Sequence, residues 1–286
     1  MLKTGIMSTA YFGIEDYESG IKKMKAHGYD CMDYQGIASC NSVFFKYGDN
    51  AFKNYFKSFG ECAQENGVEI FQMHGLWPRN ADGDLDKADI DEELYIKQLL
   101  AAEYMGCKRF VMHPCMPYGW GEEEIKERAF IETVKTINKL LPYAKKAGVI
   151  ICVENMPFKK GHSFSDIGEL KKLIRTINDE NVKACFDTGH GNCTQEDIYD
   201  CITTLGEDLE TLHVHDDIAC QDRHLIPFQG VIDWGKFIKG LKEIEYKGCI
   251  SLETEISNRM PLEIREKMQV ALADLARWFV LLIEGE

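Results

Sequence analysis

Histidines and acidic residues that can bind metal ions lie at the ends of a series of short apolar segments in this chain of 286 residues. They are His74, His113, Glu154, Asp187, His190, His213, His215 and Glu253. Imidazole and carboxylate groups together are suitable ligands for Mn²⁺, Zn²⁺, Co²⁺ or Mg²⁺. One such residue alone could equally be a hydrogen-bonded structural group. A whole series is harder to explain in that way, because each buried charge needs a partner, so the sequence predicts a divalent metal site.

The apolar segments have the length and composition of β-strands, and eight of them occur along the chain. They span residues 3–8, 29–34, 69–74, 109–113, 149–155, 182–187, 211–215 and 249–253. Longer segments with apolar residues at helical spacing lie between them, and glycines predicted to cap helices precede several strands. These glycines are Gly28, Gly67, Gly106, Gly148 and Gly248. The alternation predicts the α/β class and one (β/α)8 TIM barrel over residues 1–286, in which the strand ends meet at one mouth.

An open, doubly wound sheet is the alternative architecture for alternating strands and helices. It would normally carry a glycine-rich phosphate loop after the first strand. Residues 9–13 of this chain, Thr-Ala-Tyr-Phe-Gly, fit that loop poorly. The barrel is therefore the favoured interpretation.

Composition and charge exclude several classes of protein. The chain has 47 acidic and 33 basic residues, a formal net charge of −14, and 45% hydrophobic residues, so general polyanion or anionic-membrane binding and intrinsic disorder are not expected. The longest apolar run, Trp278 to Ile283, is far shorter than the roughly 20 residues of a membrane-spanning helix, and residues 1–5 do not begin a signal peptide. The 11 cysteines are dispersed without a C-x-x-C pair, which indicates free thiols and a cytoplasmic location.

The motifs at the strand ends resemble those of the xylose-isomerase-like TIM-barrel superfamily over most of the chain. They are V-E-N at Glu154, D-T-G-H from Asp187 to His190, H-x-x-D from His213 to Asp216, D-R-H from Asp222 to His224, and L-E-T at Glu253. Residues 224–234 are also similar to the superfamily's HLxPGxGxIDW segment, with Phe228 at the position of its first glycine. The superfamily contains sugar isomerases and epimerases, inosose dehydratases and the endonuclease IV family of abasic-site nucleases.

Resemblance to the sugar epimerases implies four ligands for one divalent ion. The corresponding residues are Glu154, Asp187, His213 and Glu253. His213 matches better than His215, because the family's histidine precedes an aspartate by three residues. The resemblance also implies that Glu154 and Glu253 are the catalytic acid and base, and that His190 binds substrate. The metal would polarise a carbonyl and stabilise an enediolate while a proton leaves and returns beside it.

Endonuclease IV is the second resemblance, and it implies a different use of the mouth. That family holds three zinc ions with nine ligands, and each ligand has a counterpart in this chain. The counterparts outside the group of four could hold a second metal ion or contact the substrate. The additional residues are His74, His113, His190, Asp222 and His224. Acidic residues between Asp82 and Glu93 would, however, repel a DNA backbone. We therefore favour a metal-dependent sugar or sugar-phosphate isomerase or epimerase, with an endonuclease IV-like zinc phosphodiesterase acting on abasic-site DNA as the alternative.

Other residues bear on the substrate. Trp77 and Trp120 fall in predicted loops and could form the aromatic wall of a sugar pocket or simply pack there. Lys160 stands where ketose 3-epimerases have a second glutamate, and it could meet a phosphate or carboxylate, while Ala219 replaces an arginine. The expected partners are small sugars or sugar phosphates rather than membranes or nucleic acids. The sequence leaves open the sugar, the metal and whether the chain forms a homo-oligomer.

Overall fold

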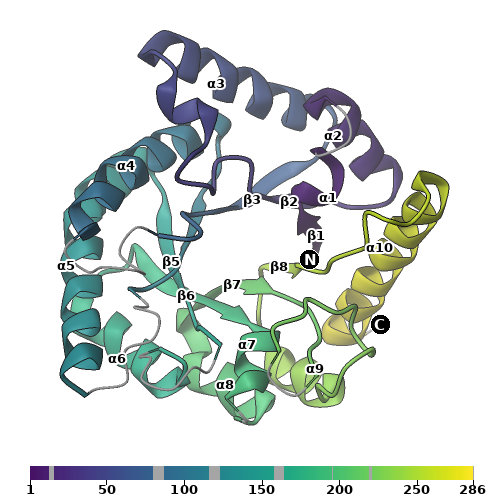
Figure 1. The fold of residues 1–286 in the computed structure, drawn as a ribbon. Coiled ribbons are helices and arrows are strands. Elements are labelled where there is room, and N and C mark those ends of the chain that lie inside the picture. Colours follow the sequence, from purple (N-terminus) through teal and green to yellow (C-terminus); the bar gives the residue numbers. More distant parts are fainter. Residues whose placement is uncertain are drawn as a thin grey trace.

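Eight parallel strands surrounded by helices form a nearly closed barrel, as predicted (Figure 1). This computed structural model describes residues 1–12, 16–79, 87–115, 123–157, 164–194, 196–218 and 221–285. The strands are β1 (Lys3–Met7), β2 (Cys31–Tyr34), β3 (Glu69–His74), β4 (Arg109–Met112), β5 (Ile150–Glu154), β6 (Val182–Asp187), β7 (Leu209–His213) and β8 (Cys249–Leu252). The chain thus has the architecture of a (β/α)8 TIM barrel.

The strands pair in the order β7-β6-β5-β4-β3-β2-β1-β8, and each neighbouring pair is parallel. The ring closes where β7 ends, because Val214, which follows β7, forms a parallel bridge with Leu252, the last residue of β8. In this bridge the Val214 amide donates to Ser251 O at 2.8 Å and the Glu253 amide to Val214 O at 3.0 Å. The closure therefore lies at the carboxyl ends of the strands, next to two of the predicted ligands.

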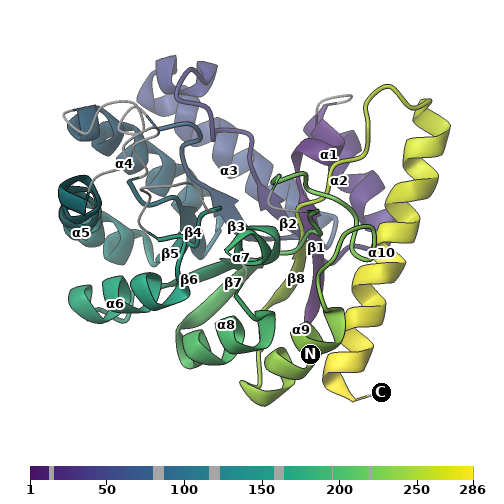
Figure 2. The same cartoon turned by 60° about the horizontal axis from the view of Figure 1, so that its bottom comes forward.

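Helices cover the outside of the barrel (Figures 1 and 2). They are α1 (Thr9–Phe12), α2 (Tyr17–Ala26), α3 (Asp49–Glu65), α4 (Ala88–Met105), α5 (Glu123–Ala147), α6 (Ile167–Ile177), α7 (Thr188–Cys193), α8 (Ile198–Leu205), α9 (Trp234–Glu243) and α10 (Leu262–Glu284), with 3-10 turns η1 (Val43–Lys46) and η4 (Gly206–Asp208). The long α10 packs along β1 and β8, and it brings Glu284 to the Leu2 amide, so the two termini lie together (Figure 2). None of the described helices has the length and hydropathy of a membrane-spanning segment.

Helix α6 illustrates how local sequence sets these elements. The Asp166 carboxylate caps its first turn by accepting hydrogen bonds from the amides of Gly168 and Glu169. Leu170, Leu173 and Ile174 recur at helical spacing and are buried, so one face packs on the barrel. Asn178 ends the helix in the left-handed conformation. Each strand is thus separated from the next by a helix whose apolar face covers the sheet.

All eight predicted strands are present, with small differences at their ends. The largest difference is in β7, which spans residues 209–213 rather than 211–215, so His215 lies beyond the strand. Gly28, Gly67, Gly106 and Gly148 have the positive φ expected of helix-capping glycines. The prediction for Gly248 is wrong, because α9 ends earlier, at Glu243, and Glu245 has the positive φ of 53° instead.

Candidate metal centre

Four carboxyl-terminal strand ends bring the four predicted ligands together at the barrel mouth. Glu154, Asp187 and His213 are the last residues of β5, β6 and β7, and Glu253 directly follows β8. One ligand atom from each of these residues lies within 4.8 Å of the others. The residues are 1%, 0%, 0% and 7% exposed in that order, so the group is shielded from bulk water. This arrangement has the donor types and the spacing of a site for a single divalent cation.

The two ring nitrogens of His213 contact different residues. Nδ1 lies 3.2 Å from Glu154 Oε1 and 3.2 Å from Glu253 Oε2, so it faces the cluster. Nε2 lies 3.0 Å from Oδ2 of Asp33, a residue of β2 that is only 1% exposed. A carboxylate can only accept, so Nε2 donates to Asp33, and Nδ1 is the nitrogen that would bind a cation in the cluster. Sequence reasoning missed Asp33, although an acid inside the apolar strand Cys31-Met32-Asp33-Tyr34 is a signal that could have revealed it.

Glu253 is also held in place by a residue that the sequence did not reveal. The Gln35 side-chain amide donates to Glu253 Oε1 at 2.9 Å. Gln35 is in turn fixed by its backbone amide, which donates to Ser8 Oγ at 2.9 Å, and by Thr9 Oγ1, which donates to Gln35 Oε1 at 3.2 Å. The other oxygen of Glu253, Oε2, faces His213. One oxygen of Glu253 is therefore anchored while the second faces the cluster.

The additional histidines surround the same carboxylates. On the β3 and β4 side, Nε2 of His113 lies 3.1 Å and Nε2 of His74 3.8 Å from Glu154 Oε2. On the other side, Nε2 of His190 lies 3.2 Å and Nε2 of His224 3.5 Å from Asp222 Oδ1. His74, His113, His190, Asp222 and His224 therefore all lie around this mouth.

Three of these rings are oriented by backbone carbonyls. Nδ1 of His74 donates to Gly75 O at 2.9 Å, Nδ1 of His190 to Asn155 O at 2.8 Å, and Nδ1 of His224 to Glu253 O at 2.8 Å. A carbonyl can only accept, so each Nδ1 carries a proton, and Nε2 is the nitrogen of each ring that faces the carboxylates of the mouth. Metal-binding histidines are commonly oriented in this way.

His215 contacts Asp187 rather than completing the group of four. Its Nε2 lies 3.0 Å from Asp187 Oδ2, and its ring stacks on the His224 ring with centroids 4.2 Å apart. Gly189 leaves room for this ring, because a Cβ there would lie 2.0 Å from His215 Cε1. The other oxygen, Asp187 Oδ1, accepts from the His190 amide at 2.7 Å at the start of α7. The Asp187 carboxylate is therefore fixed from both sides.

The loop that carries Asp222 and His224 is held by Asp216. The buried Asp216 carboxylate accepts from the amide of Phe228 at 2.9 Å, the amide of Ile232 at 3.2 Å and the indole of Trp234 at 3.1 Å. The aspartate of the H-x-x-D motif thus positions a loop. Asp222, His224 and Phe228 all adopt positive φ, of 49°, 47° and 73°. Phe228 stands where the superfamily has glycine, so it retains the backbone conformation that favours glycine.

The electrostatics of the mouth arise from carboxylates and imidazoles that perturb one another. Burial acts to raise the pKa of Glu154, but the imidazoles of His213 and His113 outweigh it and hold the pKa well below its ordinary value. Burial likewise acts to lower the pKa of His190, but Asp187 and Asp222 raise it to about 10. The pKa of His113 is lowered, chiefly by burial. Carboxylates held ionised among imidazoles favour the binding of a cation.

The structure describes only some of the other residues expected to contact the substrate. Trp77 is 45% exposed, and its ring meets the His113 ring edge-on with centroids 5.0 Å apart, so it lies at the rim of the mouth. Trp120, Lys160 and Ala219 lie outside the described residues. Their predicted roles stay predictions.

Comparison with known proteins shows similarity to one family over most of the chain. A family model described as a xylose isomerase-like TIM barrel matches residues 21–276. The uncharacterized protein MJ1311 of Methanocaldococcus jannaschii is 29% identical over 266 residues, 89% of this chain and 84% of that protein. A D-psicose 3-epimerase of Ruminiclostridium cellulolyticum is 24% identical over 245 residues, 83% and 78% of the two chains.

Two further similarities concern the fold and the alternative activity. The crystal structure of D-psicose 3-epimerase with D-tagatose from Clostridium cellulolyticum H10 superposes with a TM-score of 0.80, at 19% identity, over 97% of this chain and 99% of that one. This likeness shows a shared fold. A probable endonuclease 4 of Mycoplasma pneumoniae is 27% identical over 176 residues, 57% of this chain and 59% of that protein.

Proposed function

Because the chain belongs to the xylose isomerase-like TIM barrel family, we propose that it is a divalent-metal-dependent isomerase or epimerase that acts on a sugar or sugar phosphate. The observation that carries this proposal is the buried group of Glu154, Asp187, His213 and Glu253 at the barrel mouth. Relatives named D-psicose 3-epimerase support the substrate class. The dispersed cysteines support the cytoplasmic location that belongs to this proposal, because those described are free thiols.

The chemistry of the donor groups is suited to a metal ion. Among the described residues, the ion-pair partners of Glu154, Asp187 and Glu253 are all histidines. Several carboxylates buried together without lysine or arginine need another source of positive charge, because unpaired buried charges are costly. Imidazole and carboxylate donors fit Mn²⁺, Co²⁺, Zn²⁺ or Mg²⁺. Glu154, Asp187, His213 and Glu253 would hold this ion.

The two glutamates are placed to move a proton. They approach the same nitrogen, Nδ1 of His213, each at 3.2 Å and from different strands, so both carboxylates lie beside the proposed metal position. When bound, the ion would make the hydrogen beside a carbonyl more acidic. Glu154, which its neighbours hold ionised, accepts that proton, and Glu253 exchanges a proton on the other side. Removal and return of the proton through an enediolate of the substrate gives isomerisation or epimerisation.

Proton exchange in heavy water tests this reaction directly. The purified protein would be incubated in deuterated water with a panel of ketoses, aldoses and their phosphates. We expect deuterium to enter the carbon beside the carbonyl, and Glu154→Gln to lower that rate about 10²–10⁴-fold. Glu65→Gln is the matched control, because Glu65 is exposed at the end of α3. Absence of exchange with every sugar would contradict the proposal.

The second candidate function is zinc-dependent cleavage of DNA at abasic sites. It is favoured by the additional ligand-type residues around the mouth and by the relative named probable endonuclease 4. The formal net charge of −14 disfavours binding of a duplex backbone. Metal analysis of the purified protein separates the two, since two or three zinc ions per chain together with metal-dependent cleavage of abasic-site DNA would support the nuclease.

A further inference from the structure

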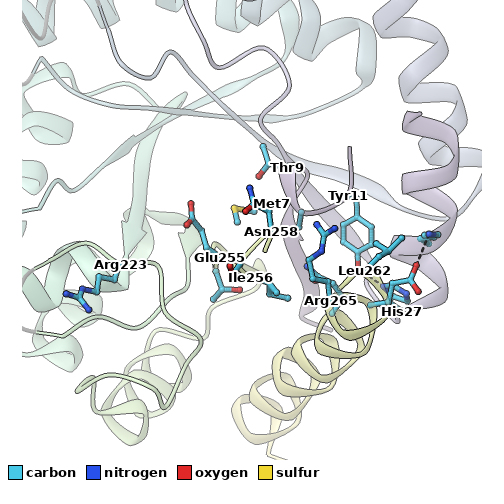
Figure 3. Close-up of a pocket in the computed structure, with 16 residues that line it drawn as sticks. Met7, Thr9, Tyr11, His27, Arg223, Glu255, Ile256, Asn258, Leu262 and Arg265 are labelled. Carbon is cyan, nitrogen blue, oxygen red and sulfur yellow. Dashed lines mark hydrogen bonds and ion pairs between the residues drawn. The ribbon is translucent and has the colours of Figure 1, made fainter. Parts of the chain in front are cut away.

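A cavity of about 630 Å³ opens beside the metal centre, between α1, the segment after β8 and the start of α10 (Figure 3). Its walls include Thr9 and Tyr11 of α1, Thr254 and Asn258 of the segment after β8, and Arg265 of α10. The volume lies in the range of small-molecule sites. None of the roles proposed above uses this cavity.

One end of the cavity borders a proposed catalytic residue. Thr254, which directly follows Glu253, is completely buried, and its hydroxyl has no hydrogen-bond partner among the described residues. Thr9 also lines the cavity and donates to Gln35, whose side-chain amide donates to Glu253. A buried hydroxyl without a partner is costly, so a polar group of a ligand in the cavity would stabilise this end. This part of the cavity is thus linked to Glu253, through the chain at Thr254 and through the hydrogen bonds of Gln35.

The α10 wall of the cavity carries a positive charge that has no partner among the described residues. No ion pair or side-chain hydrogen bond joins Arg265 to the described residues, and its Nε atom is buried. The nearby Lys23 and Glu266 pair with each other at 2.8 Å. In Figure 3 the Arg265 side chain rises from α10 toward the other lining residues, whereas Arg223 and the Glu255 carboxylate point away from it. Arg265 is therefore the cation that the cavity offers to a ligand.

We propose that this cavity binds the end of the substrate remote from the reacting carbons, and that this end carries a phosphate or carboxylate that pairs with Arg265. The substrate class is then a sugar phosphate or a sugar acid rather than a neutral sugar. The planar guanidinium matches either anion by two parallel hydrogen bonds. The inference rests on the proposed sugar chemistry at Glu154 and Glu253.

Matched substrates test the proposal. The deuterium-exchange assay would compare a ketose, its terminal phosphate ester and the corresponding sugar acid, and would give kcat/KM for each. We expect the wild-type protein to prefer either the phosphate ester or the sugar acid, and the preferred substrate identifies the anion as phosphate or carboxylate. The preference is measured as kcat/KM for this anionic substrate divided by kcat/KM for the neutral ketose. We expect Arg265→Gln to lower this preference about 10- to 100-fold.

Two further variants control for fold and for surface charge. Arg265→Lys keeps the charge and loses the planar fork, so we expect it to recover part of the preference. Arg259→Gln removes the same charge from an exposed arginine six positions earlier, and we expect no change. A wild-type preference for the neutral sugar, or an equal ratio in wild type and Arg265→Gln, would overturn the proposal.

Binding of inorganic phosphate separates failure of this inference from failure of the proposed reaction. Calorimetry would compare the wild-type protein with Arg265→Gln, so that phosphate bound elsewhere is common to both. Binding that weakens at least 10-fold in the variant supports the cavity even if no sugar exchanges a proton. Exchange with sugars would leave the reaction standing, and it would refute the cavity's role if wild type and Arg265→Gln also bound phosphate equally and had equal kcat/KM ratios for the anionic and neutral substrates.

Discussion

Loss of the Asp33 carboxylate should weaken metal binding, although Asp33 is not one of the four proposed ligands. Its Oδ2 lies 3.0 Å from His213 Nε2, and both side chains are buried, so the ring has no solvent to replace this contact. Removal of such an orienting carboxylate typically costs about 10- to 100-fold in metal affinity. That range equals about 1.4–2.7 kcal/mol. We expect Asp33→Ala to show this loss, and Asp33→Asn a smaller one, because an amide oxygen can still accept from Nε2.

Competition with a chelator for Mn²⁺ or Zn²⁺ measures the effect. Asp274→Asn removes one negative charge from an exposed site on α10 and serves as the matched control. Thermal unfolding of the metal-free variants separates loss of the fold from loss of orientation. The measurement is made under conditions in which His213→Ala no longer binds the ion. Equal metal affinity of the wild-type and Asp33→Ala proteins would then refute the argument that Asp33 directs Nδ1 at the metal centre.

Two other predictions concern the loop after β7. We expect the double variant Asp222→Ala, His224→Ala to keep the ion count per chain in elemental analysis and to bind substrate more weakly, because neither residue belongs to the group of four proposed ligands. One ion fewer per chain would instead assign Asp222 and His224 to a second metal site. Phe228 has a φ of 73°, which glycine adopts with less strain than alanine. In urea unfolding we therefore expect Phe228→Gly to be more stable than Phe228→Ala by about 1 kcal/mol. Equal stability of the two variants would contradict the strain at this position.

The strand ends and the four proposed ligands could be predicted because the signal is local. A short apolar run followed by an acid or a histidine marks both the end of a strand and the candidate ligand, as at Glu154 and Asp187. Parallel strands in a barrel all end at one mouth, so the fold itself brings such residues together. The resemblance to a known family then selects among them. Sequence alone thus predicts which side chains meet at the mouth.

The contacts that hold the ligands in place could not be predicted, because the two partners of each contact are remote in the sequence. Asp33 is 180 residues from His213, and Gln35 is 218 residues from Glu253. Both lie in or just after β2, and only Asp33 stands out there, as an acid inside an apolar strand. Their contacts follow from the closed barrel, in which β1 separates β2 from β8 and β8 adjoins β7. Arg265 was missed for the same reason, since its place in one cavity wall with Thr254 depends on how α10 packs.

His213 and His215 show why residue type and spacing do not by themselves identify a ligand. Both rings are completely buried at the mouth, and both lie near carboxylates. In His213, Nε2 contacts Asp33, and Nδ1 lies 3.2 Å from both Glu154 and Glu253, two of the other three proposed ligands. In His215, Nε2 contacts Asp187 Oδ2 at 3.0 Å and Nδ1 lies 3.2 Å from the Asp216 carbonyl, so this ring meets only one carboxylate of the group of four through its nitrogens within this distance. The choice between the two histidines therefore depends on which carboxylates the fold places around each ring.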